Sequence, residues 1–226
     1  GVGNAADPGK ERENSVLFGG KGVNVSCVLR ELGVENTALG FIAGFTGEAL
    51  AEYLSTLGIR TDFIRLPEGL TRINIKVKTR EAGAEETEIN AAGPAIPETC
   101  FEALMAKLDT LGEVDTLVLA GSIPASLPRD TYSRIMARLD GRGIRFVVDA
   151  EGALLTAVLP YRPFLIKPNL SELETTLGLE LRTLRSIRDA ALIFLRKGVQ
   201  HVVVSMGSMG AMYVSKEKTL FAPALR

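Results

Sequence analysis

The 226-residue chain has little of several things, and each shortage excludes a class of function. Its 26 basic and 27 acidic residues leave a net charge of −1, so nothing points to a nucleic acid or a membrane surface as partner. No apolar run approaches the ~18 residues that span a bilayer, and the first residues have no signal-peptide pattern. Only Cys27 and Cys100 are cysteines, both in apolar segments without metal-type spacing. Two such cysteines fit a reducing, cytoplasmic compartment. From the balanced charge, we expect a small ligand.

Histidine is also scarce, and the chain begins unusually. The single histidine, His201, opens an apolar segment, so we expect a structural role rather than a catalytic base. The sequence starts at Gly1 rather than Met, and its first 13 residues are polar and turn-like. This beginning leaves two explanations open: a fragment of a longer chain, or separate pieces joined together.

A glycine-rich stretch, 18–26, leads directly into a helical pattern. Its glycines let backbone approach a ligand closely, and the N–H groups at the start of the helix suit an oxygen-rich or anionic ligand. Lys21 adds a positive charge, and Asn24 adds a donor and an acceptor for hydroxyl groups. This pattern points to a polyhydroxylated, phosphorylated ligand. A tight strand-to-helix connection with a solvated lysine is the alternative.

Alternating strand and helix patterns predict an α/β domain with a mostly parallel sheet. A strand at 37–42 and a helix at 48–57 precede a change of character, because period-two alternation at 72–78 and 85–90 predicts a small antiparallel sheet closed by a loop at 81–84. This projecting sheet would present Arg72, Asn74 and Lys76 on one face. Further helices are expected at 97–108, 129–139, up to 158, 171–177 and 186–197, with strands at 116–120, 145–149, 164–167 and 201–205 and an edge hairpin at 210–214 and 219–222.

Polar residues follow four of the expected parallel strands. They are Gly121 with Ser122, Asp149, the run 167–169, and the run 205–207. Because ligands of such sheets collect at the carboxyl ends of the strands, these residues are candidates for a binding site. Asp149 could face phosphates or a cation, or it could cap the next helix.

These motifs resemble the ribokinase-like (PfkB) family of carbohydrate kinases, from about Phe18 to the C-terminus. The stretches Gly19–Ser26, Leu70–Lys76 and Ala120–Pro124 are most similar to the branch with 1-phosphofructokinase and tagatose-6-phosphate kinase. The resemblance implies one ribokinase-like three-layer α/β/α domain over 1–226, incomplete at both ends, with a β lid inserted at about 61–92. Such lids cover the sugar and often pair with a second subunit, which implies a homodimer.

The resemblance also implies where substrates bind. Gly20, Lys21, Asn24 and Arg72 would hold the sugar phosphate, with the planar fork of Arg72 on the phosphate. Lys76 alternates with Arg72 on the same face, so it could assist with the phosphate, or it could be a solvated lysine at the sheet edge. Lys167, Asn169, Ser205, Gly207 and Gly210 would bind ATP, and Glu172 would help to place Mg²⁺ through the ion's water shell. The alternative is an ordinary helix start, with Asn169 or Ser171 as the cap and Glu172 or Glu174 stabilising the first turn.

Two motifs of the family are missing or altered. The catalytic base of the family is the aspartate of a Gly-Ala-Gly-Asp motif, which does not occur here, so we expect it beyond Arg226. The run 4–7 lacks the proline and the spacing of the family's Asn-Pro-x-x-Asp, so Asp7 receives no role. We expect ATP-dependent phosphorylation of fructose 1-phosphate or tagatose 6-phosphate to a bisphosphate. The alternatives are a sugar-phosphate binding or regulatory protein without catalysis, and a PfkB kinase for another sugar.

Overall fold

A computed structural model describes residues 17–77 and 87–224, so Asp7 and the predicted loop at 81–84 lie outside the described residues. The main sheet has six strands in the order β12-β11-β10-β9-β8-β7. Four strands run parallel: β7 (Thr116–Ala120), β8 (Arg145–Asp149), β9 (Leu165–Ile166) and β10 (His201–Ser205). Antiparallel β11 (Ala211–Ser215) and β12 (Thr219–Ala222) complete the edge. The predicted α/β fold with a mostly parallel sheet and an edge hairpin is confirmed.

Five helices accompany this sheet: α3 (Glu98–Leu108), α4 (Thr131–Arg138), α5 (Gly152–Val158), α6 (Leu170–Leu177) and α7 (Leu184–Arg196). Each buries apolar residues, from Leu173 alone in α6 to a stripe with helical spacing in α7. In α7, for example, Ile187, Ala191 and Phe194 are buried among the residues that pack near β10 and β11. Short 3₁₀ turns lie at Leu159–Tyr161 and Gly207–Met209.

The first part of the described chain forms a smaller α/β arrangement. It contains α1 (Lys21–Glu31), β1 (Thr37–Ala38), β2 (Phe41–Ile42), α2 (Gly44–Thr56), β3 (Arg60–Thr61) and β4 (Ile64–Arg65). The strands pair in parallel, β1 with β3 and β2 with β4. The expected strand at 37–42 is thus split, and α2 begins four residues earlier than expected. Its first turns contain Gly44 and Gly47, which sequence patterns assign to a loop.

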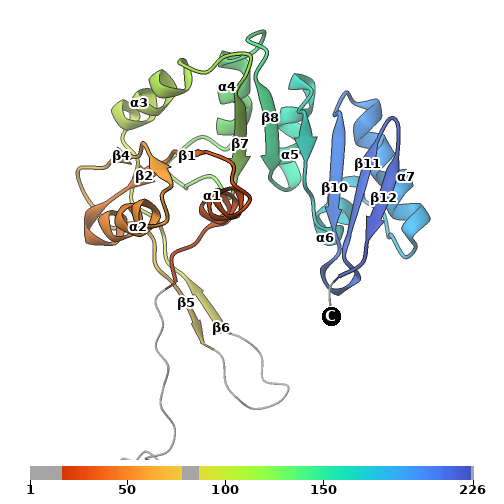
Figure 1. Cartoon of the computed structure of the whole chain (residues 1–226), viewed down its shortest axis with the longest axis horizontal. Helices are drawn as coiled ribbons and strands as arrows, with labels where there is room; N and C mark the ends of the chain where they lie inside the picture. Colours follow the sequence, from red (N-terminus) through yellow and green to blue (C-terminus); the bar gives the residue numbers. More distant parts are fainter. Residues whose placement is uncertain (1–16, 78–86, 225–226) are drawn as a thin grey trace, which may run out of the picture.

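An antiparallel hairpin projects from the rest of the molecule (Figure 1), with β5 (Asn74–Val77) paired to β6 (Thr87–Asn90). The predicted antiparallel pairing is therefore present. Arg72 lies before β5 rather than within it, and β3 and β4 pair with strands of the body. The range 61–92 for the lid insertion stays a prediction, and the side chain of Lys76 lies outside the described residues.

The core is continuous through the main sheet. The fully buried residues of three neighbouring strands include Val148 in β8, Ile166 in β9, and Val202 and Val204 in β10. His201, at the start of β10, lies edge-on to Phe164, and its Nδ1 atom is 2.8 Å from the hydroxyl of Tyr213. Both cysteines are unpaired thiols. No helix in the described part of the chain is long and apolar enough to cross a membrane.

Candidate functional site

Four charged side chains from separate parts of the sequence meet where β8 and β9 end. The Lys21 Nζ atom lies 3.3 Å from Asp149 Oδ1 and 3.8 Å from Glu172 Oε1, and Lys167 Nζ lies 3.4 Å from the same Asp149 oxygen. Both carboxylate side chains are only 10% exposed, whereas the two lysine side chains are 45% and 40% exposed. We call these four residues the charged cluster. An anion that arrives from solvent would meet the ammonium groups first.

The glycine turn delivers Lys21 to this cluster. Gly20 is the N-cap of α1 with φ 133° and ψ 151°, a backbone conformation that side chains disfavour, and a β-carbon there would meet open space. The Asn24 N–H donates to the Gly20 carbonyl at 2.9 Å and closes the first helical turn. No side chain caps α1. The first N–H groups of α1 add a partial positive charge at the end of the helix from which Lys21 reaches the cluster.

Asp149 ends β8 and does not cap α5. The N-cap of α5 is Glu151, and it has no side-chain hydrogen bond, which excludes the capping alternative for Asp149. The Asp149 side chain instead holds the two lysines. Its Oδ1 atom accepts a hydrogen bond from Lys21 Nζ, so Asp149 is the common partner of Lys21 in α1 and of Lys167, which directly follows β9.

A buried tyrosine supports the same strand end, and sequence reasoning missed it. Tyr132 in α4 donates its hydroxyl to the Gly121 carbonyl at 3.1 Å, and the Gly121 N–H donates to the Asp149 carbonyl. Burial and then the charge of Asp149 raise the pKa of Tyr132 to about 12, so its hydroxyl stays a neutral donor at neutral pH. In the sequence, Tyr132 is indistinguishable from other apolar positions of its helix.

Asn169 and Glu172 form a capping box at the start of α6. Asn169 Oδ1 accepts from the Glu172 N–H and Glu172 Oε2 accepts from the Asn169 N–H, both at 2.8 Å. The capping interpretation of these residues is therefore correct. It does not use the whole carboxylate, because Oε1 of Glu172 faces Lys21.

The donor set near Glu172 fits a magnesium ion with few protein ligands. Within residues 17–77 and 87–224, no three His, Cys, Asp or Glu side chains group as a metal site. Mg²⁺ usually keeps several waters and binds one or two carboxylates together with substrate phosphates. Asp149 and Glu172, both held near Lys21, offer such a pair of carboxylates.

The segment after β10 lies beside this capping box. Asn169 and Ser205 form a parallel bridge, and the Ser205 N–H donates to the Pro168 carbonyl at 3.1 Å. The next residues fold into a tight loop that the Met206 N–H closes onto the Gly210 carbonyl at 2.8 Å. A β-carbon at Gly210, where φ is 101°, would overlap the Ala222 carbonyl, so only glycine fits there. The predicted nucleotide residues Lys167, Asn169, Ser205, Gly207 and Gly210 thus lie along one continuous edge.

Arg72 occupies a different place. It is exposed and lies directly after Thr71, two residues before β5, at the base of the β5–β6 hairpin, which we call the lid. Among the described residues, no side-chain hydrogen bond or ion pair joins Arg72 or Asn24 to the charged cluster. The structure therefore brings together Lys21 and the nucleotide-side residues, which the sequence assigned to separate groups.

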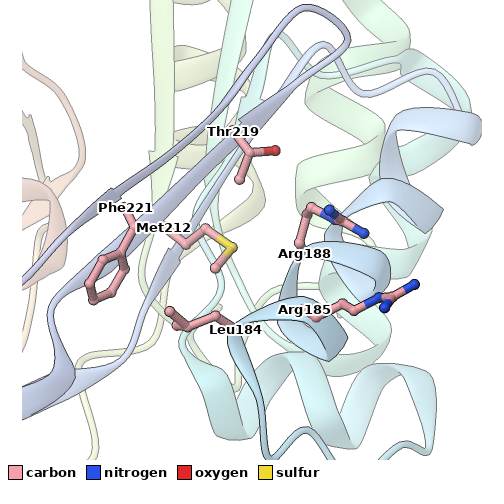
Figure 2. Close-up of a pocket in the computed structure, with 6 residues that line it drawn as sticks. All are labelled: Leu184, Arg185, Arg188, Met212, Thr219 and Phe221. Atoms are coloured by element: carbon pink, nitrogen blue, oxygen red, sulfur yellow. The ribbon is translucent and has the colours of Figure 1, made fainter.

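A hollow of about 460 Å³ lies elsewhere, between the start of α7 and the β11–β12 hairpin (Figure 2). Its lining residues are Leu184, Arg185, Arg188, Met212, Thr219 and Phe221. The two arginine head groups point away from Met212 in Figure 2, and that of Arg188 is bonded to Asp189. The hollow shares no residue with the charged cluster and offers no acid or base for chemistry.

Comparisons with known proteins agree with this geometry. The family model described as pfkB family carbohydrate kinase matches residues 3–226. A 1-phosphofructokinase of Borreliella burgdorferi is 40% identical over 92% of this chain, and a D-tagatose-1-phosphate kinase of Bacillus licheniformis is 33% identical over 92%. The structure of Escherichia coli phosphofructokinase-2 in complex with substrates and products superimposes with a TM-score of 0.85 at 29% identity, covering 92% of this chain and 68% of that one.

The matched region is not the whole of these relatives. The chain spans 66% of the length of the B. burgdorferi protein and 67% of the B. licheniformis protein. The matched span contains the glycine turn, the charged cluster and the loop after β10. The chain therefore belongs to the pfkB family of carbohydrate kinases.

Proposed function

We propose that this protein transfers the γ-phosphoryl group of ATP to a ketohexose phosphate, with fructose 1-phosphate as the first candidate, to give a bisphosphate. The observation that carries this proposal is the charged cluster, in which two lysines and two acids lie between the glycine turn and the loop after β10. The relatives with the printed names 1-phosphofructokinase and D-tagatose-1-phosphate kinase support a ketohexose phosphate as acceptor.

The sugar phosphate would bind between the glycine turn and the lid root. Gly20 would let the backbone approach the sugar, and Asn24 would bond its hydroxyl groups. Arg72 would grip the phosphate already on the sugar, because a guanidinium can pair with two phosphate oxygens at once. Lys21, at the start of α1, would lie between this phosphate and the transferring one.

ATP would lie along the edge formed by the start of α6 and the loop after β10. Lys167 would contact its phosphates, and Gly207 and Gly210 would let the backbone of the loop that begins at Ser205 approach the nucleotide closely. Glu172, with Asp149 beside it, would hold the water shell of Mg²⁺. The bound ion would offset phosphate charge and align the β- and γ-phosphates.

Phosphoryl transfer depends on positioning and charge compensation more than on covalent help from the protein. The sugar hydroxyl oxygen attacks the γ-phosphorus, the bond to the ADP oxygen breaks, and the hydroxyl proton passes to a base. Lys21 and Lys167 would stabilise the negative charge on the transferring group. The roles proposed here for Lys21 and Lys167 are positioning and charge compensation.

The lid also supports a homodimer as the working assembly. Ile73, Ile75 and Ile89 are 52–56% exposed, and Ile75 lies opposite Ile89 in the hairpin, so they present apolar surface away from the core. A second lid would cover this surface. Sedimentation equilibrium should give twice the chain mass, and a monomer at micromolar concentration would contradict this part. The cytoplasmic location stays a prediction.

A coupled ADP-release assay tests the proposed function. The protein, with any sequence that its gene encodes outside residues 1–226, is assayed with fructose 1-phosphate, tagatose 1-phosphate, tagatose 6-phosphate, fructose 6-phosphate and ribose. We expect turnover with at least one ketohexose phosphate and little with ribose. Tight binding of a sugar phosphate without turnover would favour the binding or regulatory alternative, and turnover with ribose alone would favour another sugar.

The variant Arg72→Ala sharpens this test. We expect the KM for the phosphorylated sugar to rise by about 10- to 100-fold, because a charge-assisted bidentate contact contributes about 1.5–3 kcal/mol, while the KM for ATP changes little. Arg60→Ala is the control, since Arg60 is an exposed arginine paired with Glu35. Equal effects on both substrates would contradict the role of Arg72.

A further inference from the structure

The residue before Arg72 is bound to the start of α2 by three hydrogen bonds. The Thr71 N–H donates to the Ala43 carbonyl at 2.9 Å, and the Ala43 N–H donates back to Thr71 Oγ1 at 2.8 Å. The Thr46 hydroxyl donates to the Thr71 carbonyl at 2.9 Å. Ala43 is the buried N-cap residue of α2, so the backbone of Thr71 is joined to the body of the molecule.

The residues packed around Thr71 restrict where its side chain can lie. A β-carbon at Gly47 in α2 would lie 2.7 Å from Thr71 Oγ1 and 2.8 Å from the Ile42 β-carbon. Glycine at 47 therefore opens the space that the Thr71 hydroxyl occupies. On the neighbouring part of the lid root, a β-carbon at Gly69 would lie 2.8 Å from Pro94 Cβ, so the two legs of the lid meet there.

We propose that Thr71 is a positioning residue that fixes Arg72 to the body of the molecule, so that the arginine does not move with the lid. The inference rests on the proposed function, in which Arg72 grips the sugar phosphate. Consecutive α-carbons are about 3.8 Å apart, so the anchor at Thr71 determines where the Arg72 side chain begins. The lid strand β5 starts only at Asn74, beyond this anchor.

The hydroxyl of Thr71 is the essential atom in this arrangement. Valine has nearly the same shape, but it cannot accept the hydrogen bond from the Ala43 N–H, which would then lack its partner in a buried position. Serine keeps the acceptor. The pair Thr71→Val and Thr71→Ser therefore separates the hydrogen bond from the volume of the side chain.

The first experiment is steady-state kinetics with fructose 1-phosphate and ATP varied in turn. We expect Thr71→Val to raise the KM for fructose 1-phosphate about tenfold, with the KM for ATP within about twofold of wild type, and Thr71→Ser to restore most of the loss. Ser215→Ala is the matched control, because the buried Ser215 hydroxyl also accepts backbone N–H groups, from Glu217 and Lys218, at the far end of the sheet. If Thr71→Val behaves like Ser215→Ala, the inference is wrong.

The second experiment is amide hydrogen exchange, which does not depend on the reaction. In the wild type, the N–H groups of Ala43 and Thr71 should exchange slowly, and in Thr71→Val both should exchange faster. Equally fast exchange in the wild type would overturn the anchor. If no ketohexose phosphate is turned over while both amides are protected, the proposed function and the role of Arg72 in binding a sugar phosphate are overturned. The hydrogen-bonded anchor at Thr71 is then still supported.

Discussion

Replacement of Lys21 by methionine should separate catalysis from stability more sharply than any other change in the charged cluster. Lys21 lies 3.3 Å from Asp149 and 3.8 Å from Glu172, and its side chain is 45% exposed. At an effective dielectric constant of about 20, each pair at such distances is worth about 4 kcal/mol before desolvation and screening. Exposure of the ammonium group reduces the net contribution to stability to about 1 kcal/mol.

The effect on catalysis should be larger than this. Asp149 keeps Lys167 at 3.4 Å in the variant, so the buried carboxylate retains one partner. The transferring phosphoryl group, however, would lose a positive charge placed beside it, and the loss of one such electrostatic contact costs about 10²- to 10³-fold in kcat. We therefore expect a drop of that size in kcat, with a fall in Tm of only about 2–4 °C.

The assay compares kcat, both KM values and thermal unfolding for the wild type, Lys21→Met and Lys107→Met. Lys107 is the matched control, because its ammonium group pairs with Asp62 outside the cluster and its side chain is also partly exposed. We expect Lys107→Met to keep nearly full activity. If both variants lose activity to the same small extent, or if Lys21→Met loses activity only in proportion to the protein unfolded, the reasoning is refuted.

The remaining predictions concern the groups that support the cluster. Glu172→Gln should keep the free energy of unfolding, because glutamine also completes a capping box. The same variant should lower kcat and raise the Mg²⁺ concentration needed for half-maximal activity. Asn169→Ala should instead lose about 1 kcal/mol of stability in urea unfolding. Unchanged activity of Glu172→Gln would leave only the capping role. The pKa of Tyr132 is raised to about 12 from an ordinary 10.0, so the unfolded chain releases this proton first and stability is lost as pH rises from 10 through 12, by up to about 3 kcal/mol. Tyr132→Phe should lack this loss in circular dichroism between pH 9 and 12, and parallel curves for both proteins would contradict the burial argument.

Strongly local patterns in the sequence predicted the structure well. The strands at 116–120, 145–149, 201–205 and 219–222 have the predicted bounds, because continuous or alternating apolar runs end at turn residues. The capping box at Asn169 and Glu172 was also predictable, since both partners lie within one turn. The start of α2 was not, because Gly44 and Gly47 break helical patterns, and at position 47 the packing of Thr71 requires the small residue.

The site depended on contacts that no local pattern contains. Lys21 and Asp149 are 128 residues apart, and their ion pair follows from where α1 lies against the end of β8. For this reason the sequence assigned Lys21 to the sugar and left Asp149 undecided. Tyr132 gave no signal at all, because a buried tyrosine and a buried leucine have the same helical spacing. The family resemblance supplied the residue types of the site, and the fold supplied their pairing.

Product identification by ³¹P NMR tests the central claim most directly. The protein is mixed with fructose 1-phosphate, ATP and Mg²⁺, and the spectrum is followed with time. We predict a second phosphomonoester signal on the sugar that grows in step with ADP, and a far slower reaction with Lys21→Met. ADP that accumulates with inorganic phosphate, without a new sugar phosphate signal, would contradict the account.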